Sequence, residues 1–475
     1  MRIIILSVLK EIQAAVWGIP TMALLLFTGL YLTVRLKGLQ FTQLPRAIRY
    51  IFEKEEGKGD VSAFGSLCTA LAATIGTGSI VGVATALRAG GPGALFWMWI
   101  SALLGMATKY AEGLLAVRFR TTDENGQIAG GPMYYIERGM GRNWVWLAKM
   151  FAFFGVVTAL LGCGTFPQVN AITESVESAF GVPAWLVGVI VTVAVTAVIL
   201  GGIQSISKVA EAVVPFMAIA YVIGSLAVLA FNHEAIPGAF RAIFVSAFTP
   251  NAAFGGAVGT ASAAAVITAM RTGIARGVYT NEAGLGSSPI VVAAAKTKSC
   301  VRQGLISMTS VFFTTIIICT MTGIVVISSG LLETPVGGVL LDGGKLSNAA
   351  FNQGLPGNIG MYMVTIGLIF FSFTTIIGWN YYGERCLVYL TGGVQWNRQY
   401  KLLYIGCIAA SPFLSLEPIW ILADITNALM AFPNLISLLL LSGVVVKETR
   451  YYLWEKRLNE EARPEDDPAG HGGEQ

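Results

Sequence analysis

The sequence predicts an all-α polytopic membrane protein with about eleven transmembrane helices. Of its 475 residues, 55% are hydrophobic and only 12% are charged, and the mean hydropathy is +0.67. A soluble domain would carry about 25% charged residues. Apolar runs of about 18 or more residues recur along the chain, and such runs can cross a bilayer core. Two of these runs are interrupted by glycine-rich stretches, a pattern typical of secondary transporters.

The apolar runs divide the chain into five regions. Residues 1–60 contain the first span and a cytoplasmic amphipathic segment, and residues 61–231 form a first five-helix repeat. Residues 232–250 form an extracellular connection, residues 251–446 a second repeat, and residues 447–475 a partly disordered cytoplasmic tail. The predicted spans are 14–34, 61–87, 92–118, 144–178, 182–202, 208–231, 252–280, 301–329, 358–390, 399–416 and 418–446.

The lysines and arginines predict the orientation of these spans. If the N-terminus lies outside, most of the 31 basic residues fall in loops on the cytoplasmic side, as the positive-inside rule requires. Arg271 and Arg276 are counted on the cytoplasmic side in this assignment. The C-terminus is then cytoplasmic.

The spans also suggest an internal repeat. Spans two to six and spans seven to eleven form two blocks of five, and their alternating orientation makes the second block inverted. Each block opens with an interrupted helix, at Gly76-Thr77-Gly78-Ser79 and at Gly255-Gly256-Ala257-Val258-Gly259-Thr260. Paired breaks at corresponding positions are the best sequence indication of a transporter binding site. Close helix packing is the alternative explanation for glycines in membrane helices.

The first break offers the chemistry to bind an amino acid and a cation. The helix that follows it has free N–H groups, which suit a carboxylate, and the helix that precedes it has free carbonyls, which suit Na⁺. The residues Thr74, Thr77 and Ser79 add hydroxyls, while no Asp or Glu lies between Val61 and Leu87. The alternative is that these hydroxyls bond back to their own helix.

Two further segments carry polar groups at membrane depth. Thr374 and Thr375 in span nine point about 100° apart on a helix, so both could reach one ion against a broken neighbour. Gln168 follows Pro167 in span four, and proline frees a carbonyl one turn earlier. Ordinary hydrogen bonds between helices are the alternative for all three polar residues.

The remaining polar residues do not indicate an enzyme. The sequence contains no HExxH, GxSxG or Walker loop. The charged residues in or near spans are Lys109, Glu112, Glu211, Glu282, Glu384 and Asp424. Lys109 and Glu112 are three residues apart and are placed to pair with each other. We expect no cofactor, no nucleic acid and no obligate protein partner.

Several long stretches resemble the alanine or glycine:cation symporter family, also called sodium:alanine symporters. They are GTGSIVGVATAL, GGPGALFWMWISALLGMATKYAE, GGPMYYIERGMG, ARGVYTNEAGLGSSP, IGWNYYGERCLVYL and ADITNALMAFPNLISLLLLSGVV. The resemblance implies a LeuT-like five-plus-five inverted repeat behind one extra N-terminal helix. It also implies a bacterial or archaeal inner-membrane protein that couples uptake of small neutral amino acids to Na⁺.

The resemblance further implies the positions of both ligands. Substrate would lie at the breaks of spans two and seven, and Na⁺ between spans two and nine. The implied substrate residues are Thr74, Gly76, Thr77, Gly78, Ser79, Gln168, Phe254, Gly255, Gly256, Gly259, Thr260 and Trp379. The implied Na⁺ ligands are the carbonyls of Ala73 and Thr74 and the hydroxyls of Thr374 and Thr375.

Two departures from the family pattern touch this site. Ser79 stands where the family commonly has Asn, and Thr165-Phe166-Pro167 replaces part of a GNxVQANS-like segment. We therefore expect a Na⁺-coupled importer of alanine, glycine or serine that works by alternating access. The alternatives are an H⁺-coupled or other small-solute symporter of the same fold, and a channel or receptor.

Overall fold

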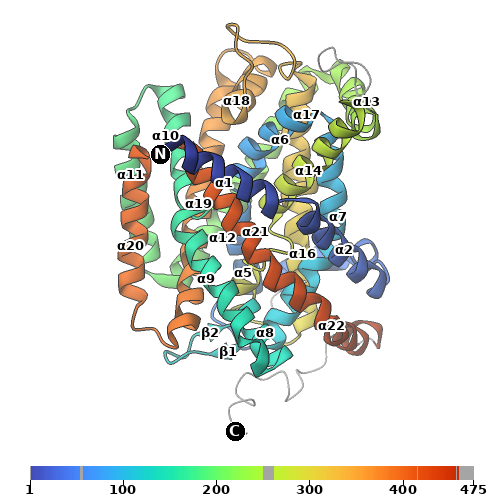
Figure 1. The fold of residues 1–475 in the computed structure, drawn as a ribbon, viewed down its shortest axis with the longest axis vertical. Helices are drawn as coiled ribbons and strands as arrows, with labels where there is room; N and C mark the ends of the chain where they lie inside the picture. The colour runs from blue at the N-terminus through green and yellow to red at the C-terminus, as the bar shows by residue number, and fades with distance from the viewer. Residues whose placement is uncertain (1, 54–56, 250–260, 415, 456, 459–475) are drawn as a thin grey trace.

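The computed structural model describes residues 2–53, 57–249, 261–414, 416–455 and 457–458. It is a helical bundle with two short strands (Figure 1). The helices of the first half are α1 Arg2–Val16, α2 Ile19–Arg35, α3 Leu39–Thr42, α4 Leu44–Phe52, α5 Ala63–Thr74, α6 Val83–Gly90, α7 Gly93–Arg118, α8 Pro132–Met140, α9 Val145–Leu161, α10 Phe166–Phe180, α11 Ala184–Ile199 and α12 Gly202–Phe231. Strands β1 Thr121–Thr122 and β2 Ile128–Ala129 pair antiparallel.

The second half begins with α13 at the upper right of Figure 1 and ends with the long helix α21 and the short helix α22. Its helices are α13 Ile236–Phe248, α14 Ala261–Asn281, α15 Pro289–Val292, α16 Cys300–Val311, α17 Thr320–Ser328, α18 Gly343–Gly354, α19 Ile359–Thr391, α20 Asn397–Ala410, α21 Leu416–Leu440 and α22 Ser442–Thr449. Three π-helical stretches, Gly78–Gly82, Phe312–Cys319 and Arg450–Trp454, join or extend these helices.

Seven helices of the described chain are long and apolar enough to cross a membrane, or eight if the bent pair containing α5 and α6 counts as one span. The predicted count of eleven therefore stays a prediction. The helix in predicted span five, α11, is shorter and apolar, and α20 in predicted span ten carries Arg398 and Lys401. Predicted span seven lies partly outside the described residues.

Two predicted spans are built differently from the expectation. Span one extends back to Leu6 and contains a break at Trp17 and Gly18, between α1 and α2. The long span four breaks between Leu161 and Phe166, where α9 ends and α10 begins. Pro167 lies in the first turn of α10, a position where its missing N–H costs nothing.

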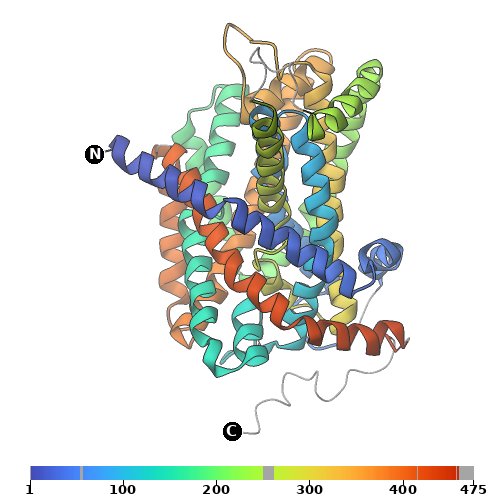
Figure 2. The same ribbon diagram turned by 45° about the vertical axis from the view of Figure 1, so that its right-hand side comes forward.

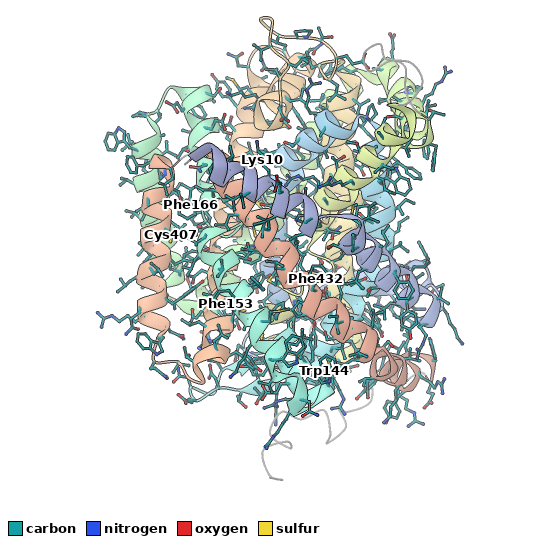
Figure 3. All side chains as sticks on the ribbon, in the orientation of Figure 1. Lys10, Trp144, Phe153, Phe166, Cys407 and Phe432 are labelled. Atoms are coloured by element: carbon teal, nitrogen blue, oxygen red, sulfur yellow. The ribbon has the colours of Figure 1, made fainter. Side chains whose placement is uncertain are left out.

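Helices α5, α7, α14, α16 and α19 form the centre of the bundle. Along α7 nearly every side chain from Gly105 to Val117 is buried, whereas α12 exposes large apolar side chains such as Phe216 and Ile223. Side chains fill the space between the helices (Figure 3). α1 and α2 cross one face of the bundle beside α21, as two views show (Figures 1 and 2).

We use two names for the ends of the bundle. The upper end carries α13 and α18, and the lower end carries β1, β2 and α8 (Figure 1). The predicted extracellular connection 232–250 contains α13 and therefore lies at the upper end. These two names do not say which end faces the cytoplasm.

A second break lies within the described part of the chain, directly after α14. Helix α14 ends at Asn281, and residues 282–288 are irregular before α15. Glu282, Gly284 and Gly286 all have positive φ angles, which a helix cannot contain. The ARGVYTNEAGLGSSP motif therefore contains a helix end in the interior.

Side chains of α7 and α21 stabilise this break. One oxygen of Glu112, Oε1, accepts the N–H groups of Gly284 at 3.1 Å and Gly286 at 3.2 Å. The side-chain amide of Asn434 donates to the same oxygen at 2.6 Å. Lys109 Nζ donates to the carbonyl of Asn281 at 3.0 Å. Lys109 and Glu112, which the sequence places to pair, lie close enough to attract each other electrostatically, but both side chains make their hydrogen bonds to backbone groups of the break.

Candidate functional site

The predicted first break is present, and it leaves two hydroxyls unpartnered. α5 ends at Thr74, and the helix that resumes at Gly78 is inclined by 53°. Thr74 Oγ1 donates to the carbonyl of Ala70 at 3.0 Å. This hydroxyl therefore bonds back to its own helix, which was the alternative to a role in ligand binding. The hydroxyls of Thr77 and Ser79 are fully buried and have no hydrogen-bond partner among the described residues. A buried hydroxyl of this kind indicates a missing partner.

Gln168 connects the first break with the break between α9 and α10. Its Oε1 accepts the N–H of Thr77 at 3.2 Å, and its Nε2 donates to the carbonyl of Cys163 at 3.1 Å. Both ends of the amide are therefore bound to protein backbone. In this structure Gln168 holds two breaks together, which is the helix-joining role given as its alternative.

The two threonines of α19 lie at the end of α5. Thr375 Oγ1 lies 3.0 Å from the carbonyl oxygens of Ala72 and Phe371, and Thr374 Oγ1 donates to Phe371 at 3.0 Å. Both threonines are buried. The carbonyl of Ala72 belongs to the last turn of α5, which lacks helical partners. Thr375 therefore reaches across to the free end of the broken helix.

Glycines make this approach possible. A Cβ at Gly378 of α19 would lie 2.9 Å from the Cβ of Ala73, and a Cβ at Gly76 would lie 2.6 Å from Thr375 Oγ1. The end of α5 at Ala72 and Ala73 thus lies directly against Thr375 and Gly378 of α19. Carbonyl and hydroxyl oxygens are the ligands that a hard cation prefers. In the described part of the chain, no three His, Cys, Asp or Glu residues gather into a metal site.

The opposite wall of the break comes from α14. Phe254, Gly255, Gly256, Gly259 and Thr260, which the family resemblance placed here, lie outside the described residues. A Cβ at Gly78 would lie 2.9 Å from Thr280 Oγ1 and 3.1 Å from a ring carbon of Tyr279.

Sequence reasoning missed this side of the site. The prediction ends span seven at residue 280, on the cytoplasmic side, and places no break after it. Gly284-Leu285-Gly286-Ser287 resembles Gly76-Thr77-Gly78-Ser79, because both segments have two glycines and end in a serine. This likeness could have predicted a second break here from the sequence.

Trp379 is buried beside the break between α9 and α10. A Cβ at Gly164 would lie 2.9 Å from the Cβ of Trp379, and its ring meets the Tyr382 ring edge-on at 5.4 Å. The Glu282 carboxyl group also interacts with the Trp379 side chain. Trp379 therefore links α19 to both of the other breaks.

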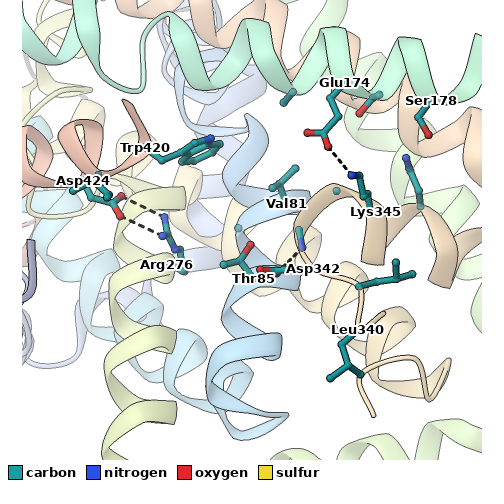
Figure 4. Close-up of a pocket in the computed structure, with 18 of the residues that line it drawn as sticks. Val81, Thr85, Glu174, Ser178, Arg276, Leu340, Asp342, Lys345, Trp420 and Asp424 are labelled. Atoms are coloured by element: carbon teal, nitrogen blue, oxygen red, sulfur yellow. Dashed lines mark hydrogen bonds and ion pairs between the residues drawn. The ribbon is translucent and has the colours of Figure 1, made fainter. Parts of the chain in front are cut away.

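A pocket of about 690 Å³ lies above the first break (Figure 4). α6, α10, α14, α18 and α21 all contribute residues to it. Arg276 of α14 binds Asp424 of α21 through two contacts of 3.3 and 3.2 Å. At the rim, Lys345 lies 3.4 Å from Glu174, and both side chains are more than half exposed. Solvent therefore has access to the pocket.

The pocket corrects one detail of the charge assignment. The prediction counted Arg276 with the cytoplasmic loops, together with Arg120 and Arg385. In the structure Arg276 shares the upper pocket with Asp342 and Lys345. Asp424 binds Arg276 within the membrane span. Arg276 is therefore not a loop residue, and the positive-inside rule, which counts basic residues in loops, does not apply to it.

The lower end is closed by backbone pairing and buried ion pairs. The foot of α5 pairs with residues 294–296, since Asp60 N–H donates to Ala294 and Lys296 N–H donates to Val61, each at 2.8 Å. Arg120 donates to the carbonyl of Ala295 at 2.8 Å.

The strand pair adds a second connection at this end. Arg385 of α19 binds Asp123 at 2.7 Å, with both side chains almost fully buried. The N–H of Ile128 donates to Asp60 Oδ2 at 2.8 Å. Burial raises the pKa of the Asp60 carboxyl above its usual value, although this bond and nearby arginines oppose the shift. The hairpin thereby joins α19 to the foot of α5.

These features define a class of protein. Broken helices meet in the interior, an open pocket leads toward them from one end, and the other end is closed, as in a secondary transporter. The solved structure of MhsT in complex with L-phenylalanine has the same fold, with a TM-score of 0.56, 11% sequence identity, and coverage of 84% of this chain and 95% of that chain. The expected LeuT-like fold is confirmed.

The chain belongs to the sodium:alanine symporter family, whose model matches residues 2–467. The "Sodium/alanine symporter AgcS" of Methanococcus maripaludis is 47% identical over 451 residues, which cover 94% of this chain and 97% of AgcS. An "Uncharacterized transporter" of Haemophilus influenzae is 55% identical over 454 residues, which cover 95% and 97%. The protein is therefore a multi-pass membrane transporter of a bacterial or archaeal plasma membrane and not an enzyme.

Proposed function

We propose that this protein imports small neutral amino acids, with alanine as the principal substrate, driven by Na⁺. The observation that carries the proposal is the first break, where the hydroxyls of Thr77 and Ser79 are buried without partners and Thr375 of α19 reaches the Ala72 carbonyl at the end of α5. The likeness to AgcS supports both ligands. The amino-acid carboxylate would lie at Thr77, Gly78 and Ser79, and Na⁺ would bind between α5 and α19.

The oxygen ligands proposed for Na⁺ are the carbonyls of Ala73 and Thr74 and the hydroxyls of Thr374 and Thr375. Thr375 already contacts the last turn of α5, so a bound ion would replace hydrogen bonds that the hydroxyl now makes to carbonyls. Na⁺ at this position draws α19 and α5 together. Substrate binding at the neighbouring break then becomes linked to the ion, because each ligand stabilises the same arrangement of the break.

Crowding at the break favours a small side chain. The contacts at Gly76 and Gly78 leave no room for an added Cβ on the protein. Glycine, alanine and serine should therefore be accepted, and leucine and phenylalanine rejected. Pocket sterics of this kind are worth about 1–3 kcal/mol per methylene.

Alternating access is the proposed transport cycle. The open pocket at the upper end and the closed lower end suit an outward-facing state, provided that the upper end lies outside the cell. The positive-inside rule supports that orientation, with the C-terminus in the cytoplasm. Import then requires the pocket to close and the hairpin contacts at the lower end to separate.

Uptake into proteoliposomes tests the proposal. Labelled alanine should accumulate against its gradient when Na⁺ is outside, and not when K⁺ replaces it. Unlabelled glycine and serine should compete, while leucine should not. Accumulation driven equally by a pH gradient without Na⁺ would favour the H⁺-coupled alternative. Flux too fast for a conformational cycle would favour a channel.

A further inference from the structure

Tyr279 lies beside the first break and next to two residues that line the upper pocket. It lies on α14 one turn below Arg276, and only 8% of its surface is exposed. The Arg276 guanidinium lies 5.5 Å from the centre of the Tyr279 ring, and the Trp420 ring lies 6.3 Å away. Both Arg276 and Trp420 line the pocket. The ring of Tyr279 lies beside Gly78, because a Cβ added at Gly78 would be 3.1 Å from a ring carbon of Tyr279.

The hydroxyl of Tyr279 is buried without a hydrogen-bond partner among the described residues. The side chain with which the Tyr279 hydroxyl interacts is that of Thr77, whose own hydroxyl is also buried without a partner at full hydrogen-bond geometry. Buried hydroxyls are almost always paired in proteins. Two of them that interact from two different broken segments indicate a ligand that pairs with both.

The chemistry of this region favours an anionic group. Both hydroxyls can donate, and a carboxylate oxygen can accept two hydrogen bonds at once. The helix that resumes after Gly78 presents its N-terminal end here, which favours negative charge. Asp424 neutralises Arg276 and holds it over the ring, so the tyrosine is fixed in place. Close packing of α14 against α6 explains the ring's position but not the unpaired hydroxyl.

We propose that the Tyr279 hydroxyl binds the carboxylate of the transported amino acid together with the Thr77 hydroxyl. This inference rests on the proposed function, and it adds a residue of α14 to the substrate site.

The test is Tyr279→Phe, which keeps the ring and removes the hydroxyl. The alanine concentration for half-maximal uptake should rise about 10- to 150-fold, the loss expected for one hydrogen bond to a charged group. Inhibition by L-alaninamide, which lacks the carboxylate, should stay as it is in the wild type. The Na⁺ dependence at saturating alanine should also change little.

The matched control is Tyr110→Phe. Tyr110 is fully buried, and its hydroxyl is already paired with that of Thr449 at 2.8 Å. This variant should bind alanine as the wild type does. Thr77→Val is the second probe, and the loss in the double variant Tyr279→Phe/Thr77→Val should be smaller than the product of the two single losses, because both hydroxyls serve one group.

An unchanged half-saturation constant in folded Tyr279→Phe overturns the inference, as does an equal weakening of alanine and alaninamide. The uptake measurements use whichever amino acid the wild type accumulates best. A wild type that prefers another amino acid overturns the alanine assignment and leaves the Tyr279 test in force. A wild type that accumulates none of them overturns both.

Discussion

At the scale of single residues, the site is distinguished by which hydroxyls are already occupied. Thr74 bonds back to its own helix, so it resembles any threonine in a membrane helix. Thr77 has no partner, and Thr375 bonds to a carbonyl of another helix that has lost its own partner. A ligand that replaces contacts within the protein is expected beside hydroxyls like those of Thr77 and Thr375, and not beside a hydroxyl like that of Thr74.

The first residue-scale prediction concerns the proposed Na⁺ ligands. Thr375→Ala and Thr374→Ala should each lower the apparent Na⁺ affinity roughly 5- to 150-fold, since a missing polar partner at a buried site costs about 1–3 kcal/mol. Apparent alanine affinity should recover at high Na⁺, because the ligands are linked. A Na⁺ titration of uptake, normalised to folded protein, measures the effect.

Thr391→Ala is the control for this prediction. Thr391 lies on the same helix, is exposed, and bonds back to the carbonyl of Leu387 at 2.9 Å. Its loss should leave the Na⁺ titration unchanged. If Thr375→Ala lowers only the melting temperature, with Na⁺ dependence intact, the threonine serves helix packing alone.

At the scale of elements, three interrupted helices meet through a few side chains. Gln168 joins the α5–α6 break to the α9–α10 break, and Tyr279 and Thr280 bring the end of α14 to Gly78. Helix ends inside a membrane need partners for their backbone groups. Glu112 and Lys109 supply those partners for the break after α14.

Removal of Glu112 should therefore destabilise the protein rather than change its substrate. Glu112→Ala leaves the N–H groups of Gly284 and Gly286 and the Asn434 amide without their acceptor. Each unpaired buried donor costs about 1–3 kcal/mol, so the melting temperature of the purified protein should fall clearly. Glu234→Ala, an exposed glutamate between α12 and α13, should leave it unchanged. Equal melting temperatures for the two variants would contradict the role given to Glu112.

At the scale of the whole molecule, the two ends of the bundle differ. The upper end holds the open pocket, and the lower end is closed by the hairpin and the segment after α15. The Arg385–Asp123 pair is 3% and 5% exposed, so it is nearly dry. Loss of one partner from such a pair typically costs about 3–5 kcal/mol, because the other charge is left buried alone.

Arg385→Gln should loosen the lower end. Ser66 is a suitable reporter, because it is buried on α5 and donates to the carbonyl of Val291 at 3.1 Å. In a background without the six native cysteines, a maleimide added from the lower side should label Ser66→Cys several-fold faster when Arg385 is replaced. Exposed Arg398→Gln should not change that rate. Identical labelling in both variants would show that the ion pair does not hold this end closed.

The sequence by itself determined the properties that depend on local composition. Low charge and long apolar runs indicate a membrane protein because the bilayer imposes them on every span. The break at Gly76-Thr77-Gly78-Ser79 was visible because glycine and hydroxyl residues act on the backbone where they stand. The family was recognisable because its motifs are long and contiguous.

The tertiary structure alone decided how distant segments combine. In the folded chain Arg276 binds Asp424, and Tyr279 lies beside Gly78. Lys109 and Glu112 form hydrogen bonds with backbone groups of the break after α14. The tertiary structure also separated Thr74, whose hydroxyl is satisfied within α5, from Thr77, whose hydroxyl is not. These outcomes rest on contacts between residues that are far apart in the chain, and on which donors and acceptors the fold leaves unpaired. No local pattern contains that information, because a hydrogen bond depends on the position of both partners.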